Sequence, residues 1–277
     1  MTRQPTPHSD APPAGPFPPD RPAWTSDALA HPHARADKPE RVRRMFAAIA
    51  PSYDLNNRLH SLWRDQAWRR FAVRAADVRP GDRVLDVACG TGDLAEVFAA
   101  GPAAEVVGLD FTPQMLDVAR ARRNRLNHAR ARKLAYVEGD ALALPFPDAS
   151  FDVVSIAFGL RNVADPARAL AEFARVLRPH GRLVILEFGQ PSTPPLSWLY
   201  RFYSGWLMPR TASLIAGDRS GAYRYLPRSV ATFLGPGELT ELLAGSGFAD
   251  PTLRRLTLGV CLCYRALRSE PAPTVPT

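Results

Sequence analysis

The sequence predicts an α/β fold in which helices cover both faces of a doubly wound, mostly parallel sheet of about seven strands, with a small helical cap. Two observations predict it. From residue 81 onward, short β-branched or leucine-rich runs alternate with helical patterns. Apolar residues make up 46% and charged residues 22% of the 277 residues, which is typical of a globular domain and excludes wholesale disorder. The length allows one large domain, and we predict a single one.

Six segments are expected to form strands and four to form helices. The strands are Arg83–Ala88, Glu105–Leu109, Ala135–Val137, Phe151–Ala157, Arg182–Phe188 and Thr257–Leu267. The helices are Asp93–Ala100, Pro113–Leu126, Asp165–Leu177 and Gly237–Ser246. The third helix has the clearest boundaries, because Asp165 suits the N-cap, Pro166 suits the first helical position, and residues 178–181 end it.

Residues 1–40 differ from the rest of the chain in composition. They hold many of the 28 prolines and show neither a helical nor a strand period. Proline fixes φ and removes a backbone donor, so we expect residues 1–40 to form a disordered extension. A shorter disordered tail is expected at 269–277, which leaves 41–268 as the folded domain.

The charge of the chain is unevenly distributed. There are 35 Lys and Arg against 27 Asp and Glu, a formal charge of +8. Seven basic residues and no acidic one lie between Arg120 and Lys133. Such a run forms either a solvated helix face and loop or a contact for anionic lipid or nucleic acid. No nucleic-acid motif accompanies it, so nucleic acid is not an expected partner, whereas a membrane surface stays open.

Cysteine use and hydropathy indicate the compartment. Three cysteines, at 89, 261 and 263, exclude a disulfide scaffold, lack zinc-ligand spacing and fit a reducing cytoplasm. The longest apolar-leaning stretch, residues 196–215, is interrupted by Arg201 and Arg210, whereas a spanning helix needs about 20 apolar residues. No secretory signal begins the chain. We expect a cytoplasmic protein without a metal site, either soluble or peripheral at the inner face of the membrane.

The polar signals fall at the carboxyl ends of the expected strands, where parallel sheets bind ligands. Residues 84–93 (VLDVACGTGD) run from a strand through a glycine turn into a helix. Gly90 and Gly92, on either side of Thr91, let the backbone turn and approach a ligand. Asp86 can attract a cationic ligand group. Asp110 ends the second strand, where a carboxylate can accept both ribose hydroxyls.

Asp140 and Ala141 follow the third strand and suit the exocyclic amine and the ring of an adenine. Together the three strand ends describe a site for an adenosine that bears a charged amino-acid group. Gly90–Ala95 also satisfies the G-x-G-x-x-[G/A] fingerprint of dinucleotide enzymes. Two carboxylates count against that alternative: Asp86 suits a positive amino-acid end, and Asp93 would repel a pyrophosphate at the N-terminus of the helix.

The order of these residues on successive strands resembles that of the class I S-adenosylmethionine-dependent methyltransferases. The resemblance implies S-adenosylmethionine as the co-substrate. The residues expected to bind it are Asp86, Gly90, Thr91, Gly92, Asp110, Asp140 and Ala141.

Three further segments resemble signatures of the UbiE/MenG/Coq5 family of quinone-biosynthesis C-methyltransferases. They are residues 46–57 (FAAIAPSYDLNN), 158–163 (FGLRNV) and 223–229 (YRYLPRS). The resemblance covers about residues 41–267. It implies methylation of a ring carbon on a reduced, prenylated quinone, either demethylmenaquinol or a benzoquinol precursor of ubiquinone. A homodimer is suggested by the relatives alone.

Arg161, Asn162 and Tyr53 are the expected catalytic residues within these segments. A guanidinium stays protonated in proteins, so Arg161 is expected to stabilise a developing phenolate rather than to act as the base. Asn162 can hold a water or a quinol oxygen, and Tyr53 can bond the other oxygen or cover the cofactor. The alternatives are a structural ion pair for Arg161 and a packed aromatic role for Tyr53. His60 is expected to be a surface or packing residue.

An aromatic segment at residues 196–208 (LSWLYRFYSGWLM) is the candidate for holding the polyprenyl tail. It can wall a tunnel, dip into a membrane interface or form the core of the helical cap. Three other functions stay open: a nicotinamide oxidoreductase with the same glycine turn, a methyltransferase of another small apolar acceptor such as an O-methyltransferase, and a non-catalytic member that binds quinone or partner enzymes.

Overall fold

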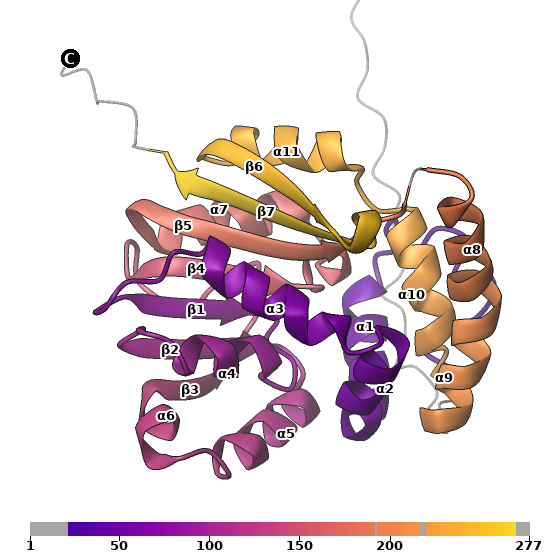
Figure 1. Cartoon of the computed structure of the whole chain (residues 1–277), viewed down its shortest axis with the longest axis horizontal. Coiled ribbons are helices and arrows are strands. Elements are labelled where there is room, and N and C mark those ends of the chain that lie inside the picture. The colour runs from indigo at the N-terminus through magenta and orange to yellow at the C-terminus, as the bar shows by residue number, and fades with distance from the viewer. Residues whose placement is uncertain (1–21, 192, 217–219, 270–277) are drawn as a thin grey trace, which may run out of the picture.

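A single mixed sheet forms the centre of the molecule, and the computed structural model describes residues 22–191, 193–216 and 220–269 (Figure 1). Its seven strands lie in the order β3-β2-β1-β4-β5-β7-β6. They are β1 (Arg83–Val87), β2 (Glu105–Asp110), β3 (Leu134–Glu138), β4 (Phe151–Ala157), β5 (Leu177–Phe188), β6 (Phe248–Leu256) and β7 (Cys261–Arg268). Neighbours from β3 to β5 are parallel, and β7 is antiparallel to β5 and β6. The predicted fold class is confirmed.

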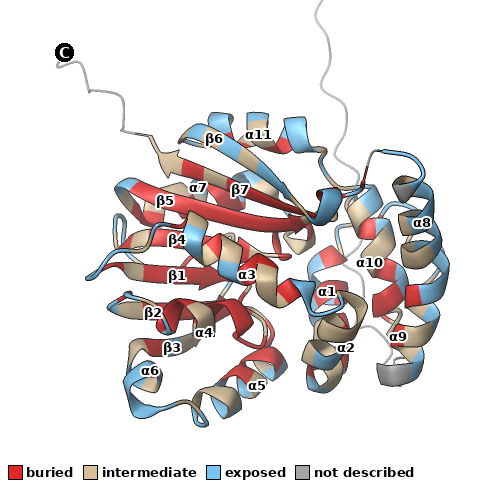
Figure 2. Ribbon diagram, viewed as in Figure 1, coloured by how far each residue is buried: buried red, intermediate tan, exposed pale blue. Residues whose placement is uncertain are grey.

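Both faces of the sheet are covered by helices, and the central strands are buried on both sides (Figure 2). The helices are α1 (Lys38–Ile49), α2 (Tyr53–His60), α3 (Arg64–Ala75), α4 (Asp93–Ala99), α5 (Pro113–Arg123), α6 (His128–Lys133), α7 (Pro166–Val176), α8 (Leu196–Phe202), α9 (Met208–Ala216), α10 (Ala222–Ala231) and α11 (Pro236–Gly245). Val84 packs with Phe98 of α4 on one face, and its neighbour Leu85 packs with Phe173 of α7 on the other. Near-continuous apolar runs are what such two-sided burial requires.

A helical cap stands beside the carboxyl ends of the parallel strands. It consists of α1, α2, α10 and a continuous helix in which the π-helical segment η3 (Tyr203–Leu207) joins α8 to α9 (Figure 1). In the described part of the chain, no helix has both the length and the apolarity that crossing a membrane requires.

The predicted disordered extension is wrong for residues 22–40. Trp24 is fully buried and stacks on Tyr225 of α10, with ring centroids 4.2 Å apart. The backbone N–H of Trp24 also donates to the carbonyl of Ser220 at 3.0 Å. Aromatic burial therefore fixes this segment against the cap, although its prolines resemble those of the preceding residues. Residues 1–21 and 270–277 lie outside the described residues.

Three strands differ clearly from the prediction. β7 begins at Cys261 rather than Thr257, because residues 257–259 form a short 3-10 helix. β5 begins at Leu177, so residues 178–181, expected to be a turn, belong to the strand. β6 was not predicted. It is an edge strand whose exposed residues include Arg254 and Arg255, and so it lacks the apolar run that marks the inner strands.

Candidate active site

A pocket lies at the carboxyl ends of β1, β2, β3 and β4. Its lining includes Gly90, Asp110, Asp140, Ala141 and Asn162 from the predicted site. The carboxylate of Asp110 is buried and accepts hydrogen bonds from the backbone N–H of Gly90 at 2.8 Å and of Thr112 at 2.9 Å. Burial raises the pKa of Asp110, and these amide donors oppose that effect. Asp110 therefore fixes the glycine turn and still faces the pocket.

Asp86, at the end of β1, is buried with only half of its carboxylate satisfied. Oδ1 accepts a hydrogen bond from the Ser155 hydroxyl at 2.7 Å, whereas Oδ2 has no hydrogen-bond partner in the described part of the chain. Burial raises the pKa of Asp86 to about 7, and the hydrogen bond from Ser155, the charge of Arg69 and the nearby backbone amide of Ala95 act in the opposite direction. A buried acceptor without a donor is costly, so a cationic ligand group would relieve it.

Different structural constraints require glycine at the two positions of the turn. Gly90 lines the pocket with a φ of +56°, and a Cβ there would lie 3.9 Å from the ring of Tyr53. Gly92 has a φ of +84°, and its Cβ would clash with the hydroxyl of Tyr136. Three of the residues predicted to bind the co-substrate, Asp86, Thr91 and Gly92, are not part of the described pocket lining. The Thr91 hydroxyl donates instead to Asp54 Oδ1 of α2, at 2.6 Å.

Several lining residues were not predicted as site residues. Phe46 of α1, Phe111 and Met115 near the start of α5, and Leu142 after β3 all border the pocket. Phe111, Met115 and Leu142 carry no motif that separates them from the core, whereas Phe46 begins the segment 46–57 that resembles a family signature. Asp140 is exposed, borders the same pocket and accepts from the backbone N–H of Leu142 at 2.9 Å.

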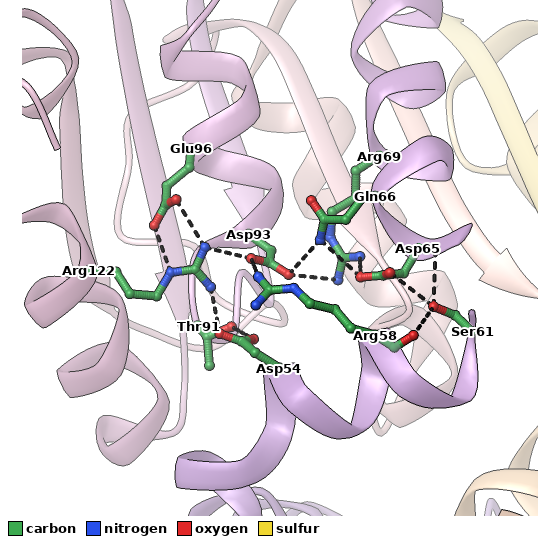
Figure 3. A network of polar contacts seen from close by, with 10 residues as sticks. All are labelled: Asp54, Arg58, Ser61, Asp65, Gln66, Arg69, Thr91, Asp93, Glu96 and Arg122. Carbon is green, nitrogen blue, oxygen red and sulfur yellow. Dashed lines mark hydrogen bonds and ion pairs between the residues drawn. The ribbon is translucent and has the colours of Figure 1, made fainter. Parts of the chain in front are cut away.

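A network of charges fixes α2 over the glycine turn (Figure 3). Asp54 of α2 pairs with Arg122 of α5 at 2.6 Å, and Arg122 also contacts Asp93 at 2.6 Å. Arg58 and Arg69 pair with the same Asp93. Burial alone would raise the pKa of Asp93, but these three arginines hold it below its usual value.

The position of Asp93 corrects one step of the sequence argument. Its charge is compensated by arginines, so it does not repel a ligand at the start of α4, and the nicotinamide alternative has to be decided on other grounds.

A second, larger cavity of about 620 Å³ lies between the sheet and the cap. Its walls come from α1, α2, α3, the α8–η3–α9 helix and α10, and are mostly apolar. Phe46, Tyr53 and Phe158 border both this cavity and the pocket at the strand ends. The two spaces therefore adjoin at these three aromatic residues.

Arg161 borders the large cavity and is held in a buried ion pair. Its Nη1 lies 2.7 Å from Glu187 Oε1 and also donates to the Phe158 carbonyl at 2.6 Å. The side chains of Arg161 and Glu187 are 5% and 3% exposed. The structural ion pair considered as the alternative role is thus present, and Nε of Arg161 has no hydrogen-bond partner among the described residues.

The other two predicted catalytic residues flank the junction of the two spaces. Asn162 borders the strand-end pocket, where its Nδ2 donates to the Phe158 carbonyl at 3.2 Å and its Oδ1 accepts from the Tyr225 hydroxyl at 2.9 Å. Tyr53 packs edge-on against Phe46, with centroids 5.9 Å apart. Burial raises the pKa of Tyr53, so its hydroxyl stays protonated at neutral pH.

His60 is a functional candidate that the sequence analysis missed. It borders the large cavity, where the Tyr203 hydroxyl donates to the His60 carbonyl at 2.9 Å and lies 3.2 Å from His60 Nδ1. Because that hydroxyl has one proton, the second contact requires Nδ1–H to be the donor. Burial lowers the pKa of His60, so the ring is neutral at pH 7, and Nε2 carries a lone pair. Nε2 is buried without a partner in the described structure.

Comparisons with known proteins identify the family. Residues 34–268 match the model of the ubiE/COQ5 methyltransferase family. The chain belongs to this family. It is 47% identical to the demethylmenaquinone methyltransferase of Deinococcus radiodurans over 82% of this chain and 92% of that one. It is 49% identical to the enzyme of the same name from Thermus thermophilus, over 79% of this chain and 98% of that one.

Relatives with a second name are nearly as similar. The ubiquinone/menaquinone biosynthesis C-methyltransferase UbiE of Ectopseudomonas mendocina is 41% identical over 84% of this chain and 91% of that one. Among solved structures, a SAM-dependent methyltransferase from Thermotoga maritima aligns with a TM-score of 0.56 at 19% identity, over 82% of this chain and 99% of that one. The fold is therefore that of class I methyltransferases. The protein is an S-adenosylmethionine-dependent methyltransferase, which removes the nicotinamide alternative.

The residues at the strand ends fit S-adenosylmethionine. Asp86 precedes Val87 and Ala88, which line the pocket, and its Oδ2 is a buried acceptor without a hydrogen-bond partner among the described residues, which suits an amino-acid ammonium group. Gly90 keeps the pocket clear of a Cβ next to Tyr53. Asp110 and Asp140 supply carboxylates to the same pocket from successive strands.

Proposed function

We propose that this methyltransferase transfers a methyl group to a ring carbon of a demethylated prenylquinol, with demethylmenaquinol as the first candidate. The observation that carries the proposal is the junction of the strand-end pocket with a large apolar cavity at Phe46, Tyr53 and Phe158. A volume of about 620 Å³ suits a fused aromatic ring with the first part of its tail. The names of the relatives from Deinococcus and Thermus support the menaquinone precursor over the ubiquinone precursor.

The strand ends would hold the co-substrate, which supplies an electrophilic methyl group. In this proposal Asp86 binds the ammonium end, Asp110 the ribose hydroxyls, and Asp140 with the backbone of Ala141 the adenine. Gly90 contributes the close backbone approach. Thr91 and Gly92 act indirectly, because Thr91 secures α2 through Asp54 and Gly92 makes room for Tyr136.

The residues around the large cavity would position the acceptor and manage its proton. A hydroquinone that loses a phenolic proton becomes electron-rich at the adjacent ring carbon, which would attack the methyl group in line. The carbon–sulfur bond would break as the new carbon–carbon bond forms, S-adenosylhomocysteine would leave, and loss of the proton from the methylated ring carbon would restore the aromatic ring. His60 Nε2 offers a lone pair to one acceptor hydroxyl, and Arg161 offers positive charge to a developing phenolate. Tyr53 and Asn162 hold the ring beside the strand-end pocket. Alignment of the two reactants supplies most of the rate, about 7–11 kcal/mol in favourable cases.

The prenyl tail of such an acceptor resides in a membrane, so we propose peripheral contact with the inner face of the membrane. The homodimer stays a prediction that rests on the relatives alone.

The test is incubation of the purified protein with methyl-labelled S-adenosylmethionine and, separately, reduced demethylmenaquinone and a demethylated benzoquinol. We expect carbon-methylated product from the first acceptor. Label on oxygen would favour the O-methyltransferase alternative. Absence of label from both acceptors, with S-adenosylhomocysteine still bound, would overturn the proposed acceptor class. If the protein neither transfers label nor binds S-adenosylhomocysteine, a non-catalytic member of the family would be favoured.

A further inference from the structure

Large apolar side chains gather on the outer side of the cap, where solvent contact is unfavourable. Trp198, Leu199, Phe202 and Trp206 of the α8–η3 helix are 49–69% exposed. Leu62 and Trp63, in the turn between α2 and α3, are 78% and 57% exposed. We call these six residues the apolar rim. In Figure 2 the outer side of α8 is coloured as exposed. An exposed group of this kind marks an interaction site.

The mouth of the large cavity lies within the apolar rim. Leu62 and Leu199 both line the cavity and are mostly exposed, so they stand at its opening. The two parts of the rim are neighbours, because the hydrogen bonds between His60 and Tyr203 join the end of α2 to η3. An apolar acceptor that enters the cavity therefore crosses the rim.

The backbone holds part of the rim outward at an energetic cost. Leu62 has a φ of 51° and Trp63 a φ of 59°, the left-handed conformation that glycine normally supplies at the end of a helix. For a bulky residue this conformation costs about 1–2 kcal/mol. Trp63 gains little packing in return, since more than half of its surface is exposed. Such strain is typical of functional surfaces.

The charge around the rim is positive. Residues 193–214 contain no Asp or Glu, and Arg210 among them is exposed. The guanidinium of Arg210 lies over the ring of Trp206, 4.6 Å from its centroid. Arg64, next to Trp63, is exposed. Tryptophan and arginine side by side suit the headgroup layer of a bilayer that contains anionic lipid. The basic run at 120–133 lies elsewhere, around α5 and α6 beside the β3 edge of the sheet (Figure 1).

We propose that the apolar rim docks in the interfacial layer of an anionic bilayer and opens the acceptor cavity directly to the lipid phase. This inference rests on the proposed function for the identity of the lipid-borne acceptor. The side chains of Trp198, Phe202 and Trp206 enter the layer while α8 lies along it. A bilayer fits this surface better than a second protein, since a protein covering the rim would close the cavity through which the acceptor enters.

The first test is direct. The full chain is mixed with vesicles of phosphatidylcholine, with or without phosphatidylglycerol, and its binding is measured by flotation. We expect binding that depends on phosphatidylglycerol and weakens at high salt. Brominated lipid is expected to quench the emission of the exposed Trp63, Trp198 and Trp206 but not that of the buried Trp24, which lines neither space.

A double variant, Trp198→Ser with Trp206→Ser, separates docking from catalysis because neither residue lines either space. We expect at least tenfold weaker vesicle binding and at least tenfold slower methylation of vesicle-embedded long-chain acceptor. Methylation of a soluble acceptor analogue without a prenyl tail should be unchanged. Leu234→Ser, at another exposed apolar residue between α10 and α11, is the matched control and should behave as wild type.

The outcomes distinguish the two proposals. Wild-type protein that binds vesicles but methylates neither acceptor would contradict the proposed function and leave the docking surface in place. Wild-type protein that ignores vesicles, or a double variant that binds them as tightly as wild type, would overturn the docking proposal. The proposal would also be overturned if the protein does not bind vesicles and the rim instead mediates self-association. Analytical ultracentrifugation would then show a smaller mass for the double variant than for wild type.

Discussion

Asp86→Asn is expected to change the pH dependence of stability as well as cofactor binding. Burial raises the pKa of Asp86 from 3.8 to about 7. Between these values the folded protein keeps a proton that the unfolded chain has released, so the free energy of unfolding falls as pH rises. From pH 5 to pH 8 the loss is about 2.5 kcal/mol, which corresponds to about 5–10 °C in Tm for a chain of this size.

An asparagine has no such proton to lose, so the free energy of unfolding of the variant lacks this fall with pH. In thermal unfolding of the ligand-free proteins, the Tm of Asp86→Asn relative to wild type should rise from pH 5 to pH 8. Calorimetric titration should show at least tenfold weaker binding of S-adenosylhomocysteine, since the ammonium group loses its anionic partner.

Ser155→Ala is the matched control for this prediction. It removes the hydrogen bond that Asp86 Oδ1 accepts, and so should extend the pH-dependent loss to higher pH. Parallel Tm profiles for Asp86→Asn and wild type would show that Asp86 does not keep its proton to a higher pH in the folded protein.

Three further predictions concern the acceptor cavity and the cover of the cofactor pocket. Arg161→Ala should lower the free energy of unfolding by about 3–5 kcal/mol because it leaves Glu187 buried and unpaired. Adding Glu187→Gln to this variant should restore its stability in denaturant but not its turnover. Restored turnover would contradict a role for Arg161 in the reaction. His60→Phe should raise the acceptor KM about tenfold, as loss of one hydrogen bond to a hydroxyl predicts, while the Kd for S-adenosylhomocysteine stays constant; an unchanged KM would rule His60 out as an acceptor ligand. Asp54→Ala should speed amide hydrogen exchange in α2 at least tenfold, because Thr91 and Arg122 lose their partner; exchange at the wild-type rate would show that the network does not hold α2.

The inner half of the fold could be predicted because its residues obey local rules. β4 was predicted at its observed bounds, and Asp165 caps α7 by accepting from the backbone N–H of Arg168. The glycine turn was evident because positive φ values restrict the residue type. Residues 22–40 and β6 were missed because their placement depends on distant contacts, such as Trp24 on Tyr225 and β6 on β7.

Only the site residues that belong to a sequence motif could be predicted. Asp110, Asp140 and Gly90 were placed at the pocket from strand-end positions, and the structure brings them together. The partner of Arg161 could not be predicted, because Glu187 lies at the end of another strand, 26 residues away. The position of His60 on the cavity wall could not be predicted for a similar reason, since it depends on a contact with Tyr203, 143 residues later.

The proposed reaction requires the strand-end pocket to present a methyl group to the apolar cavity at the junction formed by Phe46, Tyr53 and Phe158. The decisive measurement is the position of the sulfur atom in a crystal structure with S-adenosylhomocysteine. We expect the ammonium group at Asp86, the ribose at Asp110 and the sulfur facing the space between Tyr53 and Phe158. A sulfur atom that faces bulk solvent or the buried sheet, away from that junction, would contradict the account.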